Sequence, residues 1–518
     1  MGCRMPVGRV VLPAAANQII RAGGSGYVAC QSVLLKSLKM PDEMKRTGGA
    51  GPRSKLAEWA AVGGRWSILA AIVVAPTQWN ILQVGSCHLT LADPLILLAS
   101  CCWLVRLFSQ EGWWRTPWPL PWQVAAFVLP ALLSLFMVER EGMPDALREV
   151  TQLLEYFVAG YILFDDLLRA HPRRLRTVLY LLLGVTLGIV LLSVGQFFLG
   201  HDPVRGVAGT FENRNMLGGW LALMLPIVFG VALYAESFQV RMGLMVLFFC
   251  GLLVDLSAAS VGAVLLVMLL LTATRGWRAF AAAVLAVTLW VALVTPHVGG
   301  FQGSGASGSR QTSQQALVQS EAFCSPGGQM ERRYCQWQAA AEQMLANPWL
   351  GTGIGSRMPA AGACSHGVAG GASEPGTQSL YLLIGATMGL PALLGFLAML
   401  VGPALLAVMA APRHDQWRQG AVYGVGAGLA AFAMTAVWHP LLVRGIGLHL
   451  ALLLVVARLL SDWVSRDQPG GEAVSATLAR RTSGEAQGPD RMRPPRRRWR
   501  SPEHDSGRGS TGSSRSRS

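Results

Sequence analysis

Charged and amide side chains stand directly before a long apolar stretch in VRGVAGTFENRNMLGGW, residues 204–220. The polar side chains of interest are Arg205, Thr210, Asn213, Arg214 and Asn215. We expect Asn213 or Asn215 to cap a helix that begins near Met216, because an asparagine oxygen accepts a free N–H of the first turn. A helix start carries partial positive charge and the two arginines add to it, so the segment is suited to a phosphate or diphosphate. An ordinary helix start with arginines at the lipid headgroups explains the same residues equally well.

A second polar segment begins at Glu331 with ERRYCQWQAAAEQMLANPWLGTGIGS. Asn347-Pro348 ends a predicted amphipathic helix, whose apolar or aromatic positions with helical spacing are Tyr334, Trp337, Ala341, Met344 and Leu345. Arg332 and Arg333 fall in its first turn, where a cation opposes the helix dipole, so we interpret them as kept for an anionic ligand. The GTGIGS run at 351–356 fits neither a dinucleotide fingerprint nor a Walker loop, and we interpret it as a glycine-rich turn.

A third polar group precedes the next apolar stretch in SEPGTQSLYLL, which begins at residue 373. Glu374, Gln378 and Tyr381 lie just before or within the start of that stretch. We expect these side chains to face the same external cavity as Arg205 and Arg333. For Tyr381, a place in the aromatic belt at the membrane interface is an adequate alternative.

The composition indicates an integral membrane protein. Of 518 residues, 52% are hydrophobic and only 14% are charged, whereas a soluble domain usually carries about 25% charge. The net charge of +15 does not point to nucleic acid, because all four lysines precede the first apolar span and arginines crowd the tail at 491–500. Such basic flanks usually report cytoplasmic orientation and attraction to anionic lipid.

Apolar stretches of about 20 residues predict an all-α integral membrane protein with about twelve transmembrane helices. The predicted spans are 66–84, 89–107, 118–138, 148–164, 177–198, 215–234, 242–257, 259–274, 278–296, 383–411, 418–438 and 441–460. With both termini in the cytoplasm, the short cytoplasmic loops hold most of the arginine, as the positive-inside rule requires. The segments that contain Arg205 and Arg333 then lie outside.

Three regions follow from this pattern. Residues 1–60 are interpreted as a poorly ordered leader or an over-extended start, 61–464 as the membrane domain, and 465–518 as a basic disordered tail. The membrane domain includes a large external loop at 297–380 with short amphipathic helices. Three of the nine cysteines share that loop, and a disulfide is expected if it faces an oxidising compartment, but the sequence does not choose the pair among Cys324, Cys335 and Cys364.

Taken in order, the three polar segments resemble the O-antigen ligase and O-antigen polymerase superfamily. The resemblance rests on Arg…Gly-Thr-Phe-x-Asn-x-Asn, on Arg-x-x-x-Trp followed by Asn-Pro-x-x-Gly-x-Gly, and on a polar residue before Ser-Leu-Tyr-Leu…Gly-Leu-Pro. It covers roughly residues 60–460. Members are bacterial inner-membrane glycosyltransferases that use no metal and move glycan from an undecaprenyl-diphosphate carrier to a sugar acceptor at the periplasmic face.

The resemblance implies catalytic roles for particular residues. The two family arginines match Arg205 and Arg333, and the family histidine falls on Gln378, which takes no proton at neutral pH. Glu374 or His366 would then be the base, with Gln378 only orienting the acceptor. The substrate-binding set comprises Thr210, Asn213, Arg214 (where the family usually has proline), Asn215, Arg332, Trp337 and Tyr381.

The favoured function is polymerisation of O-antigen or exopolysaccharide repeat units, because the missing histidine weakens the ligase assignment. The open alternatives are a ligase that joins polymer to lipid A core, a protein O-oligosaccharyltransferase, and a secondary transporter that uses Asp93 or Asp255. The expected partners are an undecaprenyl-diphosphate-linked oligosaccharide, a glycan or lipid A-core acceptor and membrane lipids, without nucleic acid. No metal and no cofactor are expected, since no carboxylate cluster faces outside, and the expected stereochemical outcome is inversion.

Overall fold

The structure is a computed structural model that describes residues 52–78, 80–84, 87–109, 120–169, 172–199, 207–255, 257–289, 326–356, 379–409, 415–442 and 445–467. The chain divides into two compact units, Met1–Ser461 and Asp462–Ser518, and nearly all described residues belong to the first. Most of the predicted leader and tail, and residues 297–325 and 357–378 of the predicted loop, lie outside the described residues.

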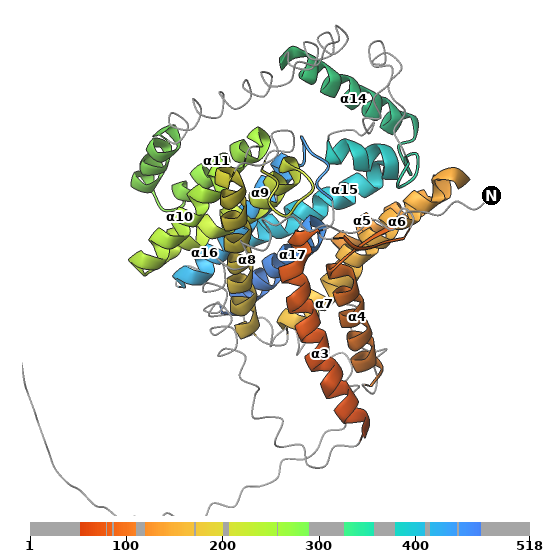
Figure 1. Cartoon of the computed structure of the whole chain (residues 1–518), viewed down its shortest axis with the longest axis horizontal. Coiled ribbons are helices and arrows are strands. Elements are labelled where there is room, and N and C mark those ends of the chain that lie inside the picture. The colour runs from red at the N-terminus through yellow and green to blue at the C-terminus, as the bar shows by residue number, and fades with distance from the viewer. Residues whose placement is uncertain are drawn as a thin grey trace, which may run out of the picture. The chain divides into compact units, whose positions relative to one another are not determined.

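The first two apolar stretches form a helical pair joined by a hairpin. Helices α3 (Pro52–Val74) and α4 (Ala92–Phe108) pack side by side (Figure 1). Between them lie the antiparallel strands β1 (Asn80–Val84) and β2 (Cys87–Thr90), with Gln83 opposite His88. The sequence predicted one helix through 66–84, but α3 ends before Pro76 and the polar residues that follow. The all-α description therefore holds for the described residues apart from this hairpin.

The middle of the chain is a broken run of helices. It comprises α5 (Trp122–Leu133), η4 (Ser134–Met137), η5 (Arg140–Gly142), α6 (Met143–Leu153), the π-helical η6 (Leu154–Gly160), α7 (Tyr161–Arg169) and α8 (Pro172–Leu199). Helix α5 packs along the later helix α15 (Leu380–Met409), where Gly395 lets the α5 backbone approach closely.

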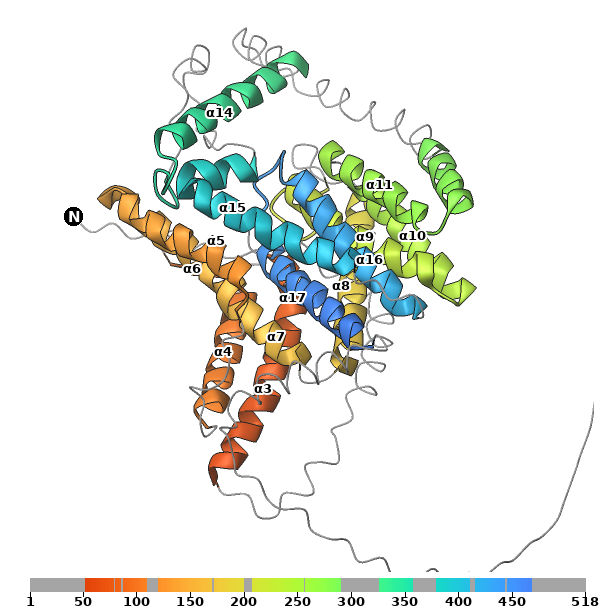
Figure 2. The ribbon, with the colours of Figure 1, turned by 180° about the vertical axis from the view of Figure 1, so that it is seen from behind.

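Helices α9 (Arg214–Tyr234) and α16 (Gln416–Thr435) form the most extensive helix pair of the fold. A Cβ on Gly230 would lie 2.7 Å from the Gly420 carbonyl oxygen, and one on Gly424 would lie 2.9 Å from the Ile227 Cα atom. Small residues at such a seam let two backbones approach closely, which is how helices associate in lipid. Against this pair pack α10 (Phe238–Val254) and α11 (Ala258–Ala273) (Figure 2). Helix α17 (Ile446–Asp467) contacts α9 where the His449 ring packs on Trp220.

Helix α14 (Pro326–Ala346) lies beside α15 in both ribbon views (Figures 1 and 2). Each predicted span contains a described helix, and the predicted division of 242–274 is confirmed by the break between α10 and α11. Four described helices are long and apolar enough to cross a membrane by themselves, at Lys55–Thr77, Arg174–Leu199, Arg214–Tyr234 and Leu380–Leu406. Twelve crossings therefore stay a prediction.

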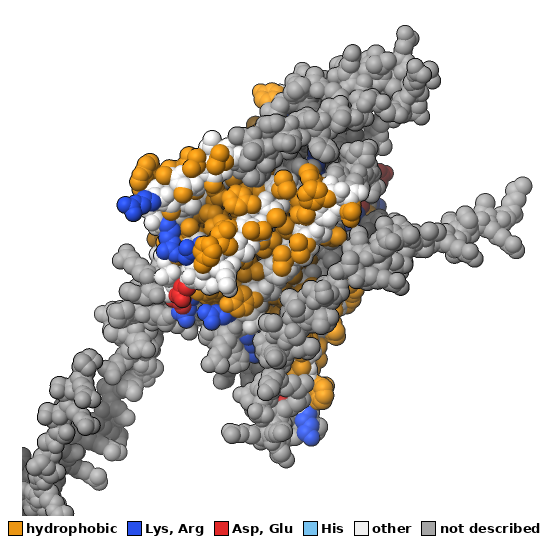
Figure 3. Space-filling view, turned by 60° about the vertical axis from the view of Figure 1, so that its left-hand side comes forward, with side chains coloured by type: hydrophobic (Ala, Val, Ile, Leu, Met, Phe, Trp, Pro, Cys, Tyr) orange, Lys and Arg blue, Asp and Glu red, His pale blue; other side chains and the backbone are white. Residues whose placement is uncertain are grey.

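The outer surface of the bundle suits a hydrocarbon environment. Figure 3 shows a face on which hydrophobic side chains predominate, with Lys and Arg side chains near its edge. Large exposed apolar residues occur on many described helices, among them Leu97, Phe136, Leu191, Val246, Leu270 and Leu394. Contiguous exposed apolar surface of this kind is rare on soluble monomers, and in a helical bundle it faces lipid.

Candidate functional site

The segment that leads into α9 is tied to the bundle by its own side chains. Gly209 adopts a left-handed φ of 60° and exchanges two hydrogen bonds with the Gln196 side-chain amide, at 2.8 and 2.9 Å. The Thr210 hydroxyl donates to the Pro76 carbonyl oxygen at 2.7 Å, and Phe211 is buried against Trp220. Most of this predicted motif thus positions the start of α9.

Asn213 caps α9, which resolves the choice that the sequence left open. Its side-chain oxygen accepts a hydrogen bond from the Met216 N–H at 3.0 Å. Arg214 is therefore the first residue of the helix and its side chain is exposed, while Asn215 is partly buried. A guanidinium at a capped helix start adds to the positive end of the helix dipole.

Two glycines in the first turns of α9 let neighbouring elements close around it. A Cβ on Gly218 would lie 2.8 Å from the Asp255 carboxylate, and one on Gly219 would collide with Leu441. The Ser260 hydroxyl donates to the Gly218 carbonyl oxygen at 2.7 Å. The start of α9 is therefore packed between the α10–α11 break and the turn between α16 and α17.

A buried polar cluster fills that junction. The Asp255 carboxylate accepts hydrogen bonds from the Ser257 N–H at 3.0 Å and the Ser260 hydroxyl at 2.5 Å. The Ser257 hydroxyl lies 3.4 Å from Nε2 of His439, which is only 6% exposed. Polar groups buried together in this way satisfy one another, and they form a rigid wall.

Helix α14 presents Arg333 toward this junction. Trp337 packs against Trp438 with 5.3 Å between ring centroids, Ala340 is fully buried, and Gly385 approaches Met344 closely. Positions 333, 337, 340 and 344 share one helix face. The predicted apolar face differs in part, because Tyr334 and Leu345 are 68% and 73% exposed.

The turn after α14 locks this helix against the bundle. Gly351, Gly353 and Gly355 all have φ between 60° and 105°, the region that glycine adopts without strain. The Thr352 and Gly353 N–H groups donate to the Ala386 and Thr387 carbonyl oxygens at 3.0 and 2.9 Å. The interpretation of 351–356 as a glycine-rich turn is confirmed.

The start of α15 adjoins the turn that carries His439. Ser379 is buried, and the Leu380 N–H donates to the Ala436 carbonyl oxygen at 2.9 Å. The Tyr381 hydroxyl donates to the Ala433 carbonyl oxygen at 2.7 Å, so it serves the packing of α15 on α16. These contacts bring the described part of the third predicted segment, from Ser379 onward, to the end of the bundle that carries His439.

An open cleft of about 620 Å³ lies between α11, α14 and the end of α16. Its wall is apolar apart from Arg333, and it is formed by Ala258, Ala259, Gly262, Ala263, Leu266, Met434, Val437 and Trp438. No atom would contact a Cβ at Gly262 within 4 Å, so the cleft is wide there. The geometry places one guanidinium at the rim of an apolar groove.

The charges of Arg214 and Arg333 both act on His439. Burial, and to a smaller extent the charges of Arg333 and Arg214, together lower the pKa of His439 from 6.5 to about 4. Its imidazole is therefore neutral at pH 7. Arg214 and Arg333 belong to helices far apart in sequence, yet the charges of both influence the same imidazole.

The predicted site residues fall into three groups: some lie near His439, some are bonded within the scaffold, and some lie outside the described residues. Arg214, Arg333 and Trp337 lie around the His439 cluster, whereas Thr210, Asn213 and Tyr381 have partners in the scaffold. The side chains outside the described residues are Arg205, Arg332, His366, Glu374 and Gln378. Sequence reasoning missed His439, and its signal was a histidine in WHP between the predicted spans 418–438 and 441–460, on the same predicted side as Arg333.

Two further expectations have a structural answer. Cys335, one of the three cysteines of the predicted loop, is disulfide-bonded. Asp93, one of the two acids considered for a transporter, accepts hydrogen bonds from the Thr90 N–H and hydroxyl, both at 2.8 Å. Asp255 is likewise bonded within its own cluster. Both carboxylates therefore have local structural partners.

Comparison with known families supplies the assignment. Residues 244–397 match the family model described as O-antigen ligase. This match, over less than a third of the chain, supports its assignment to the O-antigen ligase and polymerase superfamily. The matched range includes most of α10, all of α11 and α14 and the first part of α15, and with them Arg333 and most of the residues that line the cleft. No curated protein matches the chain significantly.

The apolar helices together with the family match indicate a multi-pass membrane protein. The matched family points to glycosyl transfer of the O-antigen ligase or polymerase type in general. Arg214 and His439 lie outside the matched range, so their place beside Arg333 is a finding of the structure.

Proposed function

We propose that this protein transfers glycan from an undecaprenyl-diphosphate-linked donor to a sugar acceptor at the periplasmic face of the bacterial inner membrane. The observation that carries the proposal is the cleft with Arg333 at its rim and Arg214 and His439 beside it. A polyprenyl chain needs an apolar surface, and its diphosphate needs cations at the end of that surface. The cleft offers both within one site.

The arginines bind the leaving group. Negative charge grows on the diphosphate as the anomeric bond breaks, and guanidinium groups hold such oxygens through forked, charge-assisted hydrogen bonds. Arg333 and Arg214 supply two of these cations, and Arg205 is proposed as a third on the basis of the sequence. Contacts that strengthen with the developing charge lower the barrier to transfer.

His439 takes the acceptor proton. The acceptor oxygen attacks the anomeric carbon from the face opposite the diphosphate, and the carbon–oxygen bond to phosphate breaks with its electron pair. The proton moves from the acceptor hydroxyl to a ring nitrogen of His439, and the anomeric configuration inverts. A neutral imidazole has one ring nitrogen with a free lone pair, which is the state that this step needs.

Donor binding makes His439 a stronger base. In the free enzyme the nearby charges of Arg333 and Arg214 disfavour its protonated form, in addition to burial. A bound diphosphate offsets both cations, which removes that part of the lowering and raises the pKa of His439. Proton transfer is then favoured only when the donor is in place. Gln378 and Glu374 orient the acceptor in this scheme.

The cysteine chemistry supports the proposed side of the membrane. A disulfide at Cys335 suits an oxidising compartment, which supports a periplasmic position for α14. Arg418, near the other end of α16, lies about 24 Å along the helix from Met434 in the cleft wall, at 1.5 Å per residue. It lies in the first turn of α16, next to a loop that the positive-inside rule assigns to the cytoplasm.

We favour a polymerase of O-antigen or exopolysaccharide repeat units over a ligase for lipid A core. The test is the analysis of lipid-linked glycans in a deletion strain. Loss of a polymerase leaves single repeat units on the carrier, whereas loss of a ligase leaves long polymer on it. Unchanged carrier-linked and surface glycans would refute glycosyl transfer as the function.

Complementation of the same strain tests the site. Arg333→Lys keeps the charge but loses the forked contact, so we expect transfer to fall about a hundredfold, within the range for loss of one donor to a developing anion. Arg418→Gln is the matched control, because it removes an arginine at the opposite end of the bundle. Protein levels in the membrane must be equal for the comparison.

A further inference from the structure

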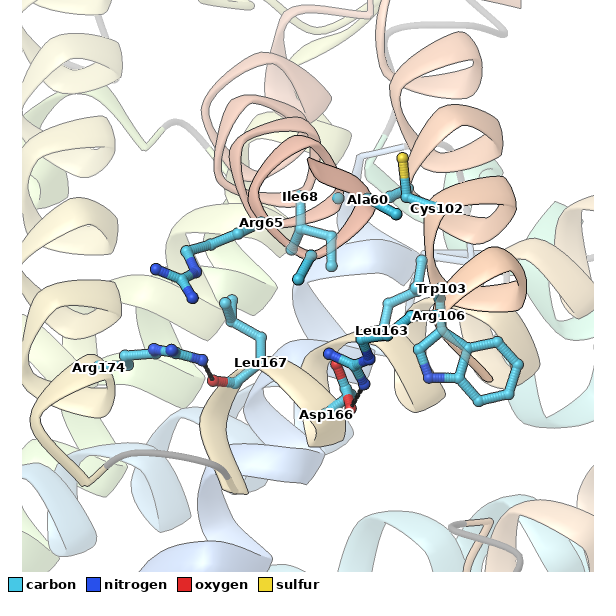
Figure 4. A pocket seen from close by; sticks show the side chains of 13 residues that line it. Ala60, Arg65, Ile68, Cys102, Trp103, Arg106, Leu163, Asp166, Leu167 and Arg174 are labelled. Carbon is cyan, nitrogen blue, oxygen red and sulfur yellow. Dashed lines mark hydrogen bonds and ion pairs between the residues drawn. The ribbon is translucent and has the colours of Figure 1, made fainter. Parts of the chain in front are cut away.

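A second arginine-lined pocket lies among α3, α4, α7 and α8. Its volume is about 130 Å³, and its polar side chains are Arg65, Arg106, Asp166 and Arg174, with Trp103 and Cys102 also on the wall. Figure 4 shows the guanidinium groups of Arg65 and Arg174 on one side of the pocket, and the pair of Arg106 and Asp166 on the other. Each of the three arginines comes from a different helix.

The charges in this pocket do not balance. Arg106 forms an ion pair with Asp166, and Arg174 donates to the Leu167 carbonyl oxygen at 3.2 Å. Within the described part of the chain, neither Arg65 nor Arg174 has an acidic partner of its own. Three arginines against one aspartate leave a charge of +2 inside the pocket.

Like charges crowd one another there. Arg174 is partly desolvated, and the charge of Arg65 acts on it unfavourably. The favourable charge of Asp166 is opposed by the unfavourable charge of Arg106. Arginines gathered between helices at a membrane surface are costly unless an anion compensates them. The pocket therefore has the charge, the forked donors and the space for one phosphate group.

This pocket is distinct from the proposed catalytic site. The carbonyl oxygen of Pro76, just after the end of α3, accepts a hydrogen bond from Thr210 in the segment that leads into the proposed catalytic site. Arg65 lies about 15 Å before Ala75 along the helix axis, and therefore far from that end. Arg106 and Arg174 lie near the ends of α4 and α8 that the positive-inside rule assigns to the cytoplasm.

We propose that Arg65, Arg106 and Arg174 bind the phosphate of an anionic ligand at the cytoplasmic surface. A phospholipid headgroup is the first source of that phosphate, because the outer faces of α3 and α4 beside the pocket expose Leu56, Trp59, Leu98 and Phe108 to acyl chains. Basic pockets between transmembrane helices bind anionic lipids in this way. Free cytosolic phosphate is the second source.

The experiment uses the full chain, purified in a neutral detergent. Dioleoyl phosphatidylglycerol, dioleoyl phosphatidylcholine and inorganic phosphate are added separately, and bound molecules and thermal stability are measured by native mass spectrometry and a melting assay. We expect phosphatidylglycerol to bind at least tenfold more tightly than phosphatidylcholine. Stabilisation by inorganic phosphate alone would assign the site to free phosphate.

Variants connect the binding to the pocket. Arg65→Gln combined with Arg174→Gln is expected to weaken phosphatidylglycerol binding at least tenfold, whereas Arg418→Gln leaves it unchanged. In the wild-type chain, phosphatidylglycerol should also protect Arg65 and Arg174 from phenylglyoxal modification, a readout that does not depend on how the variants fold. Equal binding of both lipids with no effect of phosphate, or modification of the two arginines at the same rate with and without ligand, would overturn the proposal.

Discussion

The fall in the rate of glycosyl transfer at acidic pH (the acid limb of its pH profile) is expected to depend on the charges around His439. In the free enzyme its pKa is about 4, through burial and through the charges of Arg333 and Arg214. A bound diphosphate offsets the two guanidinium charges but leaves the burial, which is the largest cause, in place. We therefore expect the pKa of His439 to rise by about one pH unit on donor binding, out of the full gap of 2.5 between 6.5 and 4.

The assay separates the two states of the enzyme. Purified protein in vesicles receives carrier-linked glycan isolated from the deletion strain, with acceptor in excess. The pH profile of kcat/KM for the donor reports the donor-free enzyme, and that of kcat reports the donor complex. We expect the acid limb of kcat to lie about one pH unit above that of kcat/KM.

Substitution identifies the group behind this limb. His439→Gln should lower kcat at pH 7 by about 10² to 10⁴, the range for loss of a general base, and remove the limb. His449→Gln is the matched control, because it changes another buried histidine whose ring packs on Trp220. Identical limbs for kcat and kcat/KM, or a limb that persists in His439→Gln, would refute the reasoning.

Three further predictions address charge, stability and packing. Arg214→Gln should raise the pKa of His439 in the free enzyme, so the acid limb of kcat/KM moves to higher pH while that of kcat moves less. The folded protein holds His439 neutral, so its contribution to the free energy of unfolding is fully present above pH 6.5. That contribution is lost as the pH falls toward 4, by about 3 kcal/mol in all. Urea titrations at pH 7 and pH 4 should show a smaller loss of stability in His439→Gln than in the wild type. Gly389 has a φ of 86° and lies against the Trp349 carbonyl, so Gly389→Ala should destabilise the protein by about 1–3 kcal/mol in a melting assay, whereas Gly262→Ala, with open space at its Cβ, should leave stability within about 0.5 kcal/mol.

Helix positions were predictable because apolar length is a local property of the chain. A division between the spans 242–257 and 259–274 was predicted, and the structure places it at Asp255, between the end of α10 and the start of α11. The hairpin at Asn80–Thr90 was not predicted, because its short apolar runs extend the pattern of the neighbouring helices. Only the residues around Pro76 signalled the end of α3.

The site was predictable in its parts but not as an assembly. The capped start of α9 and the presence of a helix carrying Arg333 followed from capping chemistry and spacing. The start of that helix was predicted wrongly, because α14 begins at Pro326 and Arg332 and Arg333 therefore lie beyond its first turn. His439 could not be selected in this way, because its neighbours Ser257, Arg214 and Arg333 are brought together only by packing. The buried face of α14 was also misjudged in part, since a helix of mixed composition does not specify which partner it meets.

Photo-crosslinking tests the central claim most directly. Undecaprenyl diphosphate with a benzophenone near its first isoprene units is irradiated with the purified protein in nanodiscs, and labelled peptides are mapped by mass spectrometry. The account predicts labels on α11 around Gly262 and on the Met434–Trp438 turn, which are reduced at least tenfold by Arg333→Gln and unchanged by Arg418→Gln. Labels concentrated on other helices, or labels on the cleft that do not respond to Arg333→Gln, would contradict it.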